Sequence, residues 1–381
     1  MVSPTVSPTL TPRRVVEADG TVHVGWFDGP FAEMNLAEAP IRHALSPLRS
    51  GSLSFVERSY RRWRLKRWLY TSVVTERVFF ACAVVDLGYI GNAFAYVVDR
   101  QTGTKHEYNA LAPLGRGLRM AGSSTDGRTE FRDPRWGQIV LDVDSAAGIR
   151  KVDVRLEGQL GRDPKPPLEA RYEIRDTGRD PAAVIVVEES EPQRWLYTHK
   201  CYGLEAGGFV RSGDIQDEVA VGEGSAGLDF NCGYRPRQTW WNWAAAGGRA
   251  QGGERIGFNV TAHRPWPGAR GAQGRPRATG EPDAGDCALW LPGGCVKLPR
   301  VEFEYDPSDI MKTWWLRDDE GLVDLRFEPR GKRSDDVNLG MVVSQFHQPY
   351  GTFSGTLRSR AGEVFELADV FGVTEQHYAL W

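Results

Sequence analysis

The stretch "GLVDLRFEP" (321–329) decides the fold class, because its apolar and charged residues alternate strictly. The apolar residues from Val323 to Phe327 fall on one face of an extended chain, and the charged residues between them fall on the other. Alternation with period two indicates a β-strand with one buried face. "RKVDVRLEG" (150–158) and "VEFEYD" (301–306) repeat the pattern. We therefore expect an all-β protein with few helices.

Turn sequences separate the predicted strands at short intervals. "DRQTG" (99–103), "DSAAG" (144–148), "DDEG" (318–321) and "RSRAG" (358–362) each end in glycine, the residue that a positive φ favours. Many short strands joined by tight turns are typical of antiparallel sandwiches and barrels. The best helix candidate, residues 31–45, is interrupted by a proline, so it does not change this expectation.

The length of 381 residues favours two domains. Proline, serine and threonine dominate residues 1–14, where we expect a disordered tail. We place the domain boundary near residue 190, before "EPQRWLYTHK", which gives domains at 15–190 and 191–381. The stretch 264–286 is rich in glycine, proline and arginine and is expected to be a flexible surface insertion in the second domain.

Composition argues against several classes of partner and location. The net charge of -3 gives no general attraction to a polyanion, so nucleic-acid binding is not expected. The longest apolar run, "VFFACAVV" (78–85), is far too short to span a membrane as a helix. The five cysteines form no CxxC pair and indicate reduced thiols. Since the N-terminus also lacks a secretory apolar segment, we expect a cytoplasmic protein.

Sequence motifs for cofactors and metals are absent or out of context. A GxGxxG pattern occurs at Gly222, Gly224 and Gly227, but the residues that follow, "LDFNCGYRP", cannot open the helix that a dinucleotide site requires. No HExxH or GxSxG motif is present, and no spacing provides three or four zinc ligands. We therefore expect neither a metal nor a cofactor, while an acid–base enzyme with dispersed groups stays open.

"TWWNWAAAGG" (239–248) is the densest aromatic patch. On a strand Trp241 and Trp243 face one way and Asn242 faces the other. A buried amide between tryptophans needs hydrogen-bond partners, so Asn242 is either a core brace or a polar anchor in an aromatic pocket. With Tyr202, these three residues are the candidate ligand-binding residues.

Three titratable residues in strand-like settings are the candidate catalytic residues: Asp229, His347 and Glu375. Inside a barrel, desolvation would shift their pKa values toward neutrality and permit proton transfer. His347, in "SQFHQPYGTFSGTL" (344–357), is either a polar group at the mouth of a ligand-holding barrel or a residue where a hairpin leaves the core. Other titratable residues in such settings are His199, Lys200, Glu205 and His377.

Several blocks occur in the order expected of one family: "WLYTHKCYGLEAGG", "LDFNCGYRPRQTWWNWAAAGG", "VEFEYD", "FHQPYGTFSGTL" and "GVTEQHYALW". On these blocks the chain resembles the domain of unknown function 2804 family over about residues 22–381. More remotely it is similar to proteins with two lipocalin-like barrels, which include carotenoid hydratases and fungal cyclisation enzymes. The resemblance implies two calycin-like antiparallel β-barrels, or strongly curved sandwiches, in tandem, and an apolar, isoprenoid or polyketide-like ligand.

The sequence departs from the family pattern at two places. Asp286 and Cys287 stand where the family tends to have an acidic residue followed by asparagine, and Trp240 stands where a histidine precedes "WNW". If either family residue moves protons, the activity here is in doubt.

Three functions are compatible with these observations. The first is binding of an apolar or amphipathic, lipid-like molecule in a barrel cavity or in the groove between barrels, with the tryptophans as contact surface. The second is a cofactor-independent hydratase, isomerase or cyclase, in which Asp229 or Glu375 protonates an alkene and His347 orients water. The third is a carbohydrate-active or carbohydrate-binding β-sandwich with tryptophan platforms.

Overall fold

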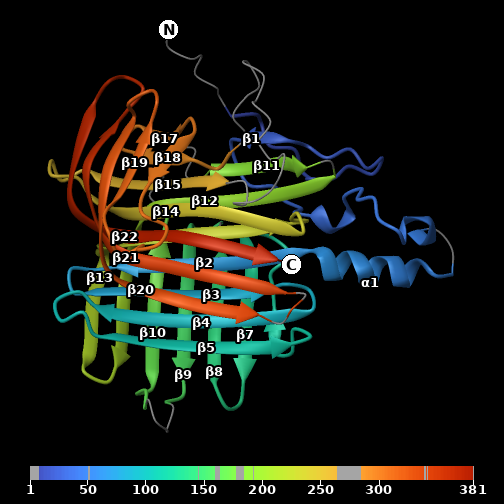
Figure 1. The fold of residues 1–381 in the computed structure, drawn as a ribbon, viewed down its shortest axis with the longest axis horizontal. Helices are drawn as coiled ribbons and strands as arrows, with labels where there is room; N and C mark the ends of the chain where they lie inside the picture. Colours follow the sequence, from blue (N-terminus) through green and yellow to red (C-terminus); the bar gives the residue numbers. More distant parts are fainter. Residues whose placement is uncertain are drawn as a thin grey trace.

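The computed structural model describes residues 8–49, 52–144, 146–158, 164–176, 184–191, 193–263, 285–338, 340 and 342–380. Most of these residues form antiparallel β-strands (Figure 1), which confirms the all-β prediction. The insertion predicted at 264–286 lies outside the described residues except for its last two. The tail predicted at 1–14 lies outside them up to residue 7. From there the chain runs against a strand, with the amide of Thr9 donating to the carbonyl of Trp26 at 2.8 Å.

The first sheet contains thirteen strands. They are β1 (Gly25–Phe27), β2 (Lys66–Val74), β3 (Val78–Asp86), β4 (Ile90–Asp99), β5 (Lys105–Pro113), β6 (Leu118–Arg119), β7 (Asp126–Asp133), β8 (Gly137–Asp144), β9 (Ile149–Leu156), β10 (Leu168–Arg175), β11 (Val184–Glu191), β12 (Arg194–Ser212) and β13 (Ile215–Gly233). Their order is β5-β4-β3-β2-β13-β12-β10-β9-β8-β7-β6, with β11 joining β12 to β1.

The second sheet contains nine strands in the order β17-β16-β15-β14-β22-β21-β20-β19-β18. They are β14 (Gln238–Arg249), β15 (Arg255–His263), β16 (Ala288–Leu291), β17 (Gly294–Lys297), β18 (Val301–Glu304), β19 (Trp314–Asp318), β20 (Val323–Asn338), β21 (Val343–Arg358) and β22 (Val364–Leu380). The described helices are η1 (Leu36–Glu38), η2 (Ser46–Arg49) and α1 (Ser54–Arg64).

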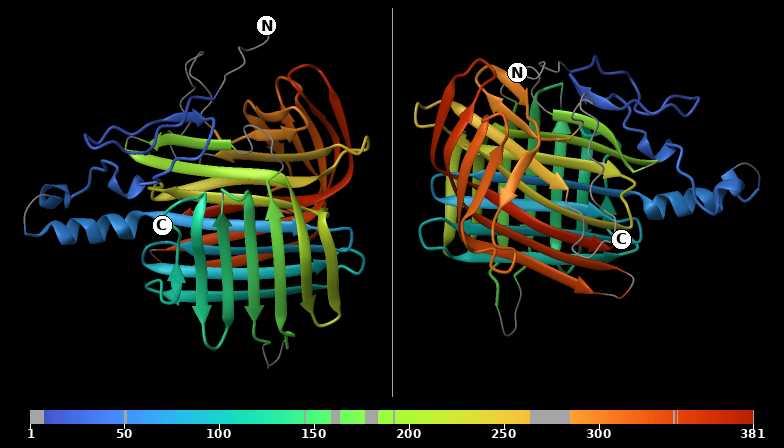
Figure 2. Two further views of the ribbon diagram at one scale, coloured as in Figure 1. Left: turned by 180° about the vertical axis from the view of Figure 1, so that it is seen from behind. Right: turned by 45° about the horizontal axis from the view of Figure 1, so that its top comes forward.

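Each sheet curls toward a barrel. In the first, the layer formed by β7–β10 lies across the layer formed by β2–β5 (Figures 1 and 2), and the rings of Phe80 and Tyr172 meet between them at 5.6 Å. In the second, Phe258 of β15 packs edge-on against Phe353 of β21 at 4.9 Å. The chain therefore forms two near-barrel antiparallel sheets in tandem, as the sequence predicts.

The chain passes from the first sheet to the second between Gly233 and Gln238. The predicted boundary near residue 190 does not coincide with this passage, because β12 and β13 still pair with β10 and β2 of the first sheet. The predicted boundary falls near the end of β11, which pairs with β12. The division into two domains remains a prediction.

The two sheets meet along β12 and β15, where glycines permit close backbone contact. At the bulge of β12, Gly203 has φ +77°, and a Cβ there would lie 2.6 Å from the carbonyl oxygen of Ile256. A Cβ on Gly257 would lie 2.4 Å from the carbonyl group of Tyr202. Only glycine allows both backbones to approach so closely, and the approach fixes the seam between the sheets.

Candidate functional site

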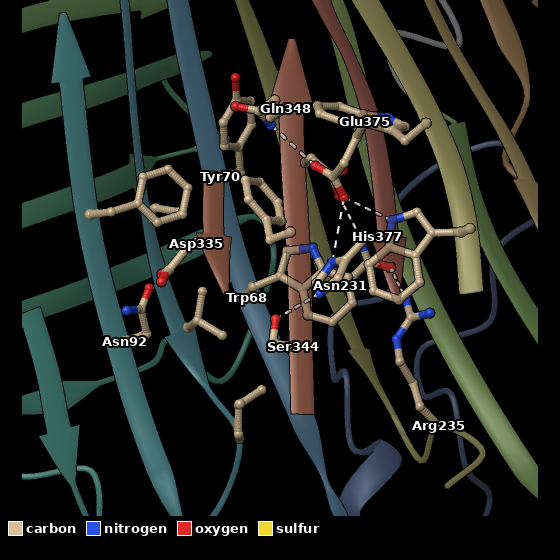
Figure 3. Close-up of a pocket in the computed structure, with 18 of the residues that line it drawn as sticks. Trp68, Tyr70, Asn92, Asn231, Arg235, Asp335, Ser344, Gln348, Glu375 and His377 are labelled. Carbon is tan, nitrogen blue, oxygen red and sulfur yellow. Dashed lines mark hydrogen bonds and ion pairs between the residues drawn. The ribbon is translucent and has the colours of Figure 1, made fainter. Parts of the chain in front are cut away.

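A cavity of about 270 Å³ lies at the seam between the two sheets. One wall comes from β2–β5, β12 and β13 of the first sheet, and the other from β14, β15 and β20–β22 of the second. Figure 3 shows side chains from both walls pointing toward one another across it. The volume is close to the lower end of the range for small-molecule sites.

Tryptophans from the two sheets form the aromatic wall. Trp68 of β2 and Trp241 of β14 stack with ring centroids 6.4 Å apart and planes 10° apart. The guanidinium of Arg235 lies over both rings, at 4.5 Å from Trp68 and 5.4 Å from Trp241. Trp243, two residues along β14, meets Tyr70 edge-on at 5.6 Å. Period-two alternation brings 241 and 243 to the same face, so one strand supplies two aromatic contacts.

Aliphatic side chains line the outer part of the cavity. They come from both sheets: Leu87, Ile90, Leu111, Val337, Val342 and Val343. Leu111 is 57% exposed, and the others are half-buried, so these residues mark where the cavity opens. Arg333 and Asp335, on the same face of β20 as Val337, also line the cavity and lie 3.6 Å apart.

A buried cluster of charges lies at the inner end. Nζ of Lys200 is 3.0 Å from Oδ2 of Asp229 and 2.9 Å from Oδ2 of Asp286. Burial alone would lower the pKa of Lys200, but the two carboxylates outweigh it and raise that pKa. Burial raises the pKa of Asp229 above its usual value, although Lys200 opposes the shift. Two carboxylates sharing one ammonium leave an excess acceptor at this end of the cavity.

Asn231 connects this cluster to the aromatic wall. Its Nδ2 donates to Oδ1 of Asp229, and its Oδ1 accepts from Oγ1 of Thr198 at 2.8 Å and from Nη2 of Arg235 at 3.1 Å. These partners hold the amide in one orientation and fix Arg235 over the stacked tryptophans.

Glu375 of β22 forms the second polar group of the cavity. Its Oε1 accepts from Nε1 of Trp241 at 2.8 Å, and its Oε2 accepts from Nε2 of Gln348 at 3.1 Å. Nδ1 of His377 lies 3.6 Å from Oε1, and Nε2 of His377 lies 3.0 Å from Oγ of Ser344 (Figure 3). A carboxylate, an imidazole and a hydroxyl thus lie side by side along the cavity wall, with a hydrogen bond between the imidazole and the hydroxyl.

Four of the predicted site residues line the cavity: Asp229, Glu375, Trp241 and Trp243. The structure brings them together from three strands of two different sheets. Asp286 also lines the cavity and contacts Lys200. It is the acidic residue that the family pattern has at this place, and the departure is Cys287, the residue after it.

Asn242, Tyr202 and His347 lie elsewhere. Asn242 points into the second barrel, where its Nδ2 donates to the hydroxyl of Tyr305 at 2.9 Å. Tyr202 is packed between Trp243 and Trp290, at 6.4 and 5.9 Å.

His347 lies on the face of β21 that points away from the cavity, the same face as Asn242, because both residues pair with Gln376 of β22. Its Nδ1 is 3.1 Å from Oγ of Ser334, and its Nε2 is 3.7 Å from a carboxylate oxygen of Asp336. Partial burial lowers its pKa. The alternation of β21 points Ser344, Phe346 and Gln348 into the cavity, and His347 points the other way.

Sequence reasoning missed several lining residues. Trp68, Arg235, Gln348 and Ser344 carry no motif, and only their three-dimensional placement makes them part of the site. Lys200 and His377 had a signal, since each is a titratable residue within an apolar strand. Among the described residues no three His, Cys, Asp or Glu side chains gather in a way that could hold a metal ion. No described helix is long and apolar enough to cross a membrane.

The fold and the seam cavity define a protein of two near-barrel antiparallel sheets in tandem, with a cavity lined by apolar, polar and charged side chains. The chain belongs to the family described as Domain of unknown function (DUF2804), whose model matches residues 8–381. No curated protein matches the sequence.

Among solved structures, the chain is similar to kievitone hydratase from Nectria haematococca at 9% identity, with 83% of this chain and 88% of that chain covered and a TM-score of 0.45. It is similar to CghA with Sch210972 at 10% identity, covering 82% and 87%, with a TM-score of 0.48. An AttH-like protein from Nitrosomonas europaea matches at 12% identity, covering 82% and 92%, with a TM-score of 0.38.

Proposed function

We propose that the protein binds one apolar or amphipathic, lipid-like small molecule in the seam cavity. The observation that carries the proposal is the graded lining, with aliphatic residues at the mouth, stacked tryptophans further in and buried charges at the inner end. A hydrocarbon part would bury against Trp68 and Trp241, and a polar head would bond to groups such as Asp229 and Asn231. Sites for small molecules combine apolar walls with a few placed polar groups in this way.

Titration with all-trans-retinol tests the proposal, because energy transfer from the cavity tryptophans reports binding. Ala83 of β3 lines the cavity, and Ala83→Phe would fill part of it without touching a charged group. We expect saturable quenching in the parent protein and its loss in Ala83→Phe. Ala147→Phe, at an exposed turn, is the matched control and should bind like the parent. Quenching that is absent, or identical in both variants, contradicts the proposal.

Native mass spectrometry of the protein purified from its expression host gives an independent check. We expect a co-purifying molecule of discrete mass in the parent protein and its absence in Ala83→Phe. A spectrum of the bare chain for both, combined with no retinol binding, would remove the support for a ligand in this cavity.

A second candidate is an enzyme that adds water to, or isomerises, a lipid-like alkene. The close placement of Glu375, His377 and Ser344 and the raised pKa of Asp229 favour it, since a carboxylic acid in an apolar site can protonate a double bond. The proton would move from the acid to one alkene carbon. Water would attack the other carbon and return its proton to the carboxylate or to His377.

Incubation with an isoprenoid alkene such as geranylgeraniol in water enriched in ¹⁸O and in deuterium oxide tests this candidate. Hydration adds labelled oxygen to the product, and isomerisation introduces deuterium. Glu375→Gln should abolish incorporation while retinol binding persists. Label incorporation that survives both Glu375→Gln and Asp229→Asn would exclude these residues as the acid.

The third function, binding or cleavage of a carbohydrate, gains no comparable support. Trp241 and Trp243 are 8% and 5% exposed, so neither forms an open platform for a sugar ring. None of the five cysteines forms a disulfide. A cytoplasmic location remains part of the proposal.

A further inference from the structure

Helix α1 projects from one end of the molecule (Figures 1 and 2). Its last turn leads into β2, which carries Trp68 of the cavity wall. The turn between β3 and β4 packs on the helix end, since a Cβ on Gly88 would lie 2.5 Å from the carbonyl oxygen of Arg62. Leu87 and Ile90 flank that glycine and line the cavity mouth. The end of the helix therefore packs against the turn that carries residues of the cavity mouth.

One face of α1 is covered by the segment that precedes it. The carboxylate of Glu57 accepts from Nε of Arg61 and lies 3.2 Å from Nε2 of His43. Arg61 also donates to the carbonyl oxygen of Ala37 at 2.8 Å, and the ring of Tyr60 packs on His43 at 4.6 Å. Glu57 is the only acidic residue of the helix, and it is fully buried by these contacts.

The opposite face of α1 carries aromatic and basic side chains in contact with solvent. Phe55 is 57% exposed and Trp63 is 55% exposed, and Arg58 and Arg62 lie between them on the same helical face. Single exposed apolar residues are ordinary, but aromatics interleaved with arginines on a projecting helix are typical of helices that lie in a membrane interface. Such a face buries its aromatics among lipid chains and pairs its arginines with phosphates.

Leu114 extends this face beyond the helix. It is 80% exposed at the tip of the turn after β5 and has φ 55°, a left-handed conformation that strains leucine and suits glycine or asparagine. Its amide donates to the carbonyl of Tyr89 at 3.1 Å, and the ring of Trp63 packs on Tyr89 at 6.1 Å. Leu114 and Trp63 thus flank the same residue. An exposed leucine at a strained backbone position indicates that this surface contacts a partner.

The charge of this end suits an anionic partner. Arg58, Arg62 and Arg116 are exposed, and among the described residues none of the three pairs with a carboxylate. Burial raises the pKa of Tyr89, and Arg237 and Arg64 oppose that shift, which places two more positive charges beside it. Each arginine near an anionic lipid surface adds favourable binding energy that salt weakens.

We propose that Phe55, Arg58, Arg62, Trp63, Leu114 and Arg116 form a docking surface that seats the protein on a bilayer containing anionic lipids. The cavity mouth then faces the membrane, from which an apolar ligand can enter past Leu87, Ile90 and Leu111. The docking does not depend on the proposed function. The entry of a ligand from the membrane rests on the proposed function.

Co-sedimentation of the full chain with vesicles tests the docking surface. We expect binding to vesicles of phosphatidylcholine and phosphatidylglycerol, weak binding to phosphatidylcholine alone, and release at high salt. Arg58→Gln, Arg62→Gln and Arg116→Gln combined should weaken binding by about tenfold or more. Phe55→Ser, Trp63→Ser and Leu114→Asn combined should have a similar effect. The matched control combines Arg128→Gln, Arg155→Gln and Val364→Ser, which are exposed residues on other strands, and should bind like the parent.

Equal binding to neutral and anionic vesicles, no vesicle binding, or unchanged binding in both docking variants overturns the proposal. Retinol titration of the same variants separates it from the proposed function, because no docking residue lines the cavity. Vesicle binding without retinol binding in the parent would leave docking standing and the ligand proposal refuted. Retinol binding without vesicle binding would do the reverse.

Discussion

His199 and Lys200 are neighbours on β12, yet they lie in opposite kinds of interior. His199 points into the first barrel, where its Nδ1 lies 2.8 Å from Oγ of Ser124 and burial lowers its pKa to about 3. Lys200 points into the seam between the barrels, where two carboxylates keep it charged. Around His199 the first barrel is closely packed, and the buried Arg150, which pairs with Asp176, also lowers the pKa of this histidine. The seam retains space and organises charge around it.

The difference shows that a strand buried on both faces can serve packing on one face and chemistry on the other. Period-two alternation separates the two sets of side chains, but it does not say which set meets a cavity. In the first barrel buried polar atoms bond to one another locally, as in the chain from His199 through Ser124 to Tyr197. At the seam they are numerous and converge on one space.

The largest effect is expected from removing the charge that balances the seam. Lys200→Met leaves Asp229 and Asp286 buried without their ammonium, and we expect a loss of about 3 to 5 kcal/mol in the free energy of unfolding. Urea denaturation measures it. Adding Asp229→Asn and Asp286→Asn to Lys200→Met should restore most of the loss. If the single variant loses less than about 1 kcal/mol, the cluster does not depend on that ion pairing.

A matched pair on β3 compares the two interiors directly. Val84 is fully buried in the packed core, and its neighbour Val85 borders the cavity. Val84→Ala creates a void in a close-packed region and should cost about 2 kcal/mol, whereas Val85→Ala only enlarges an existing space and should cost about 1 kcal/mol or less. Thermal unfolding of both variants checks this order. Equal losses would mean that the seam is as tightly packed as the core.

Acid should weaken the first barrel through His199. Its pKa is about 3 in the folded protein and near 6.5 when unfolded, so the unfolded chain binds the extra proton. The contribution is complete above about pH 6.5 and declines as the pH falls toward 3, reaching a loss of about 2 kcal/mol near pH 5. The difference in unfolding free energy between the parent and His199→Gln, measured from pH 7 to 5, isolates it. A difference that does not change with pH would show that His199 is accessible to protons in the folded state.

The smallest effects should come from the face of β21 that points away from the cavity. His347→Ala is expected to change stability by no more than about 0.5 kcal/mol and to leave retinol affinity unchanged, since His347 lies outside the cavity. Gln348→Ala, one residue further along, removes a donor to Glu375 and should change retinol affinity. A loss of binding in His347→Ala alone would reverse this assignment of faces.

The strands and the two curled sheets were predictable, because alternation and glycine turns report local structure directly. The seam was only partly predictable. The alternation in "TWWNW" correctly places Asn242 on the face opposite to Trp241 and Trp243. Which of the two faces meets the cavity depends on the packing of the second sheet against the first. The same holds for β21, where alternation sets His347 apart from Gln348 without saying which one faces inward. Trp68 and Arg235 enter the site through contacts between sheets that no local pattern records.

The pairing of β2 with β13 joins Lys66, in the first half of the chain, to Gly233, in the second half. During synthesis on a ribosome, the edge of β2 that pairs with β13 therefore stays unpaired until β13 has left the exit tunnel. The walls contributed by β20–β22 follow later still. Long-range strand pairing is slow and leaves sticky edges exposed, so the nascent chain is a natural client for chaperones. The seam, the last region to be completed, forms only when the final strand arrives.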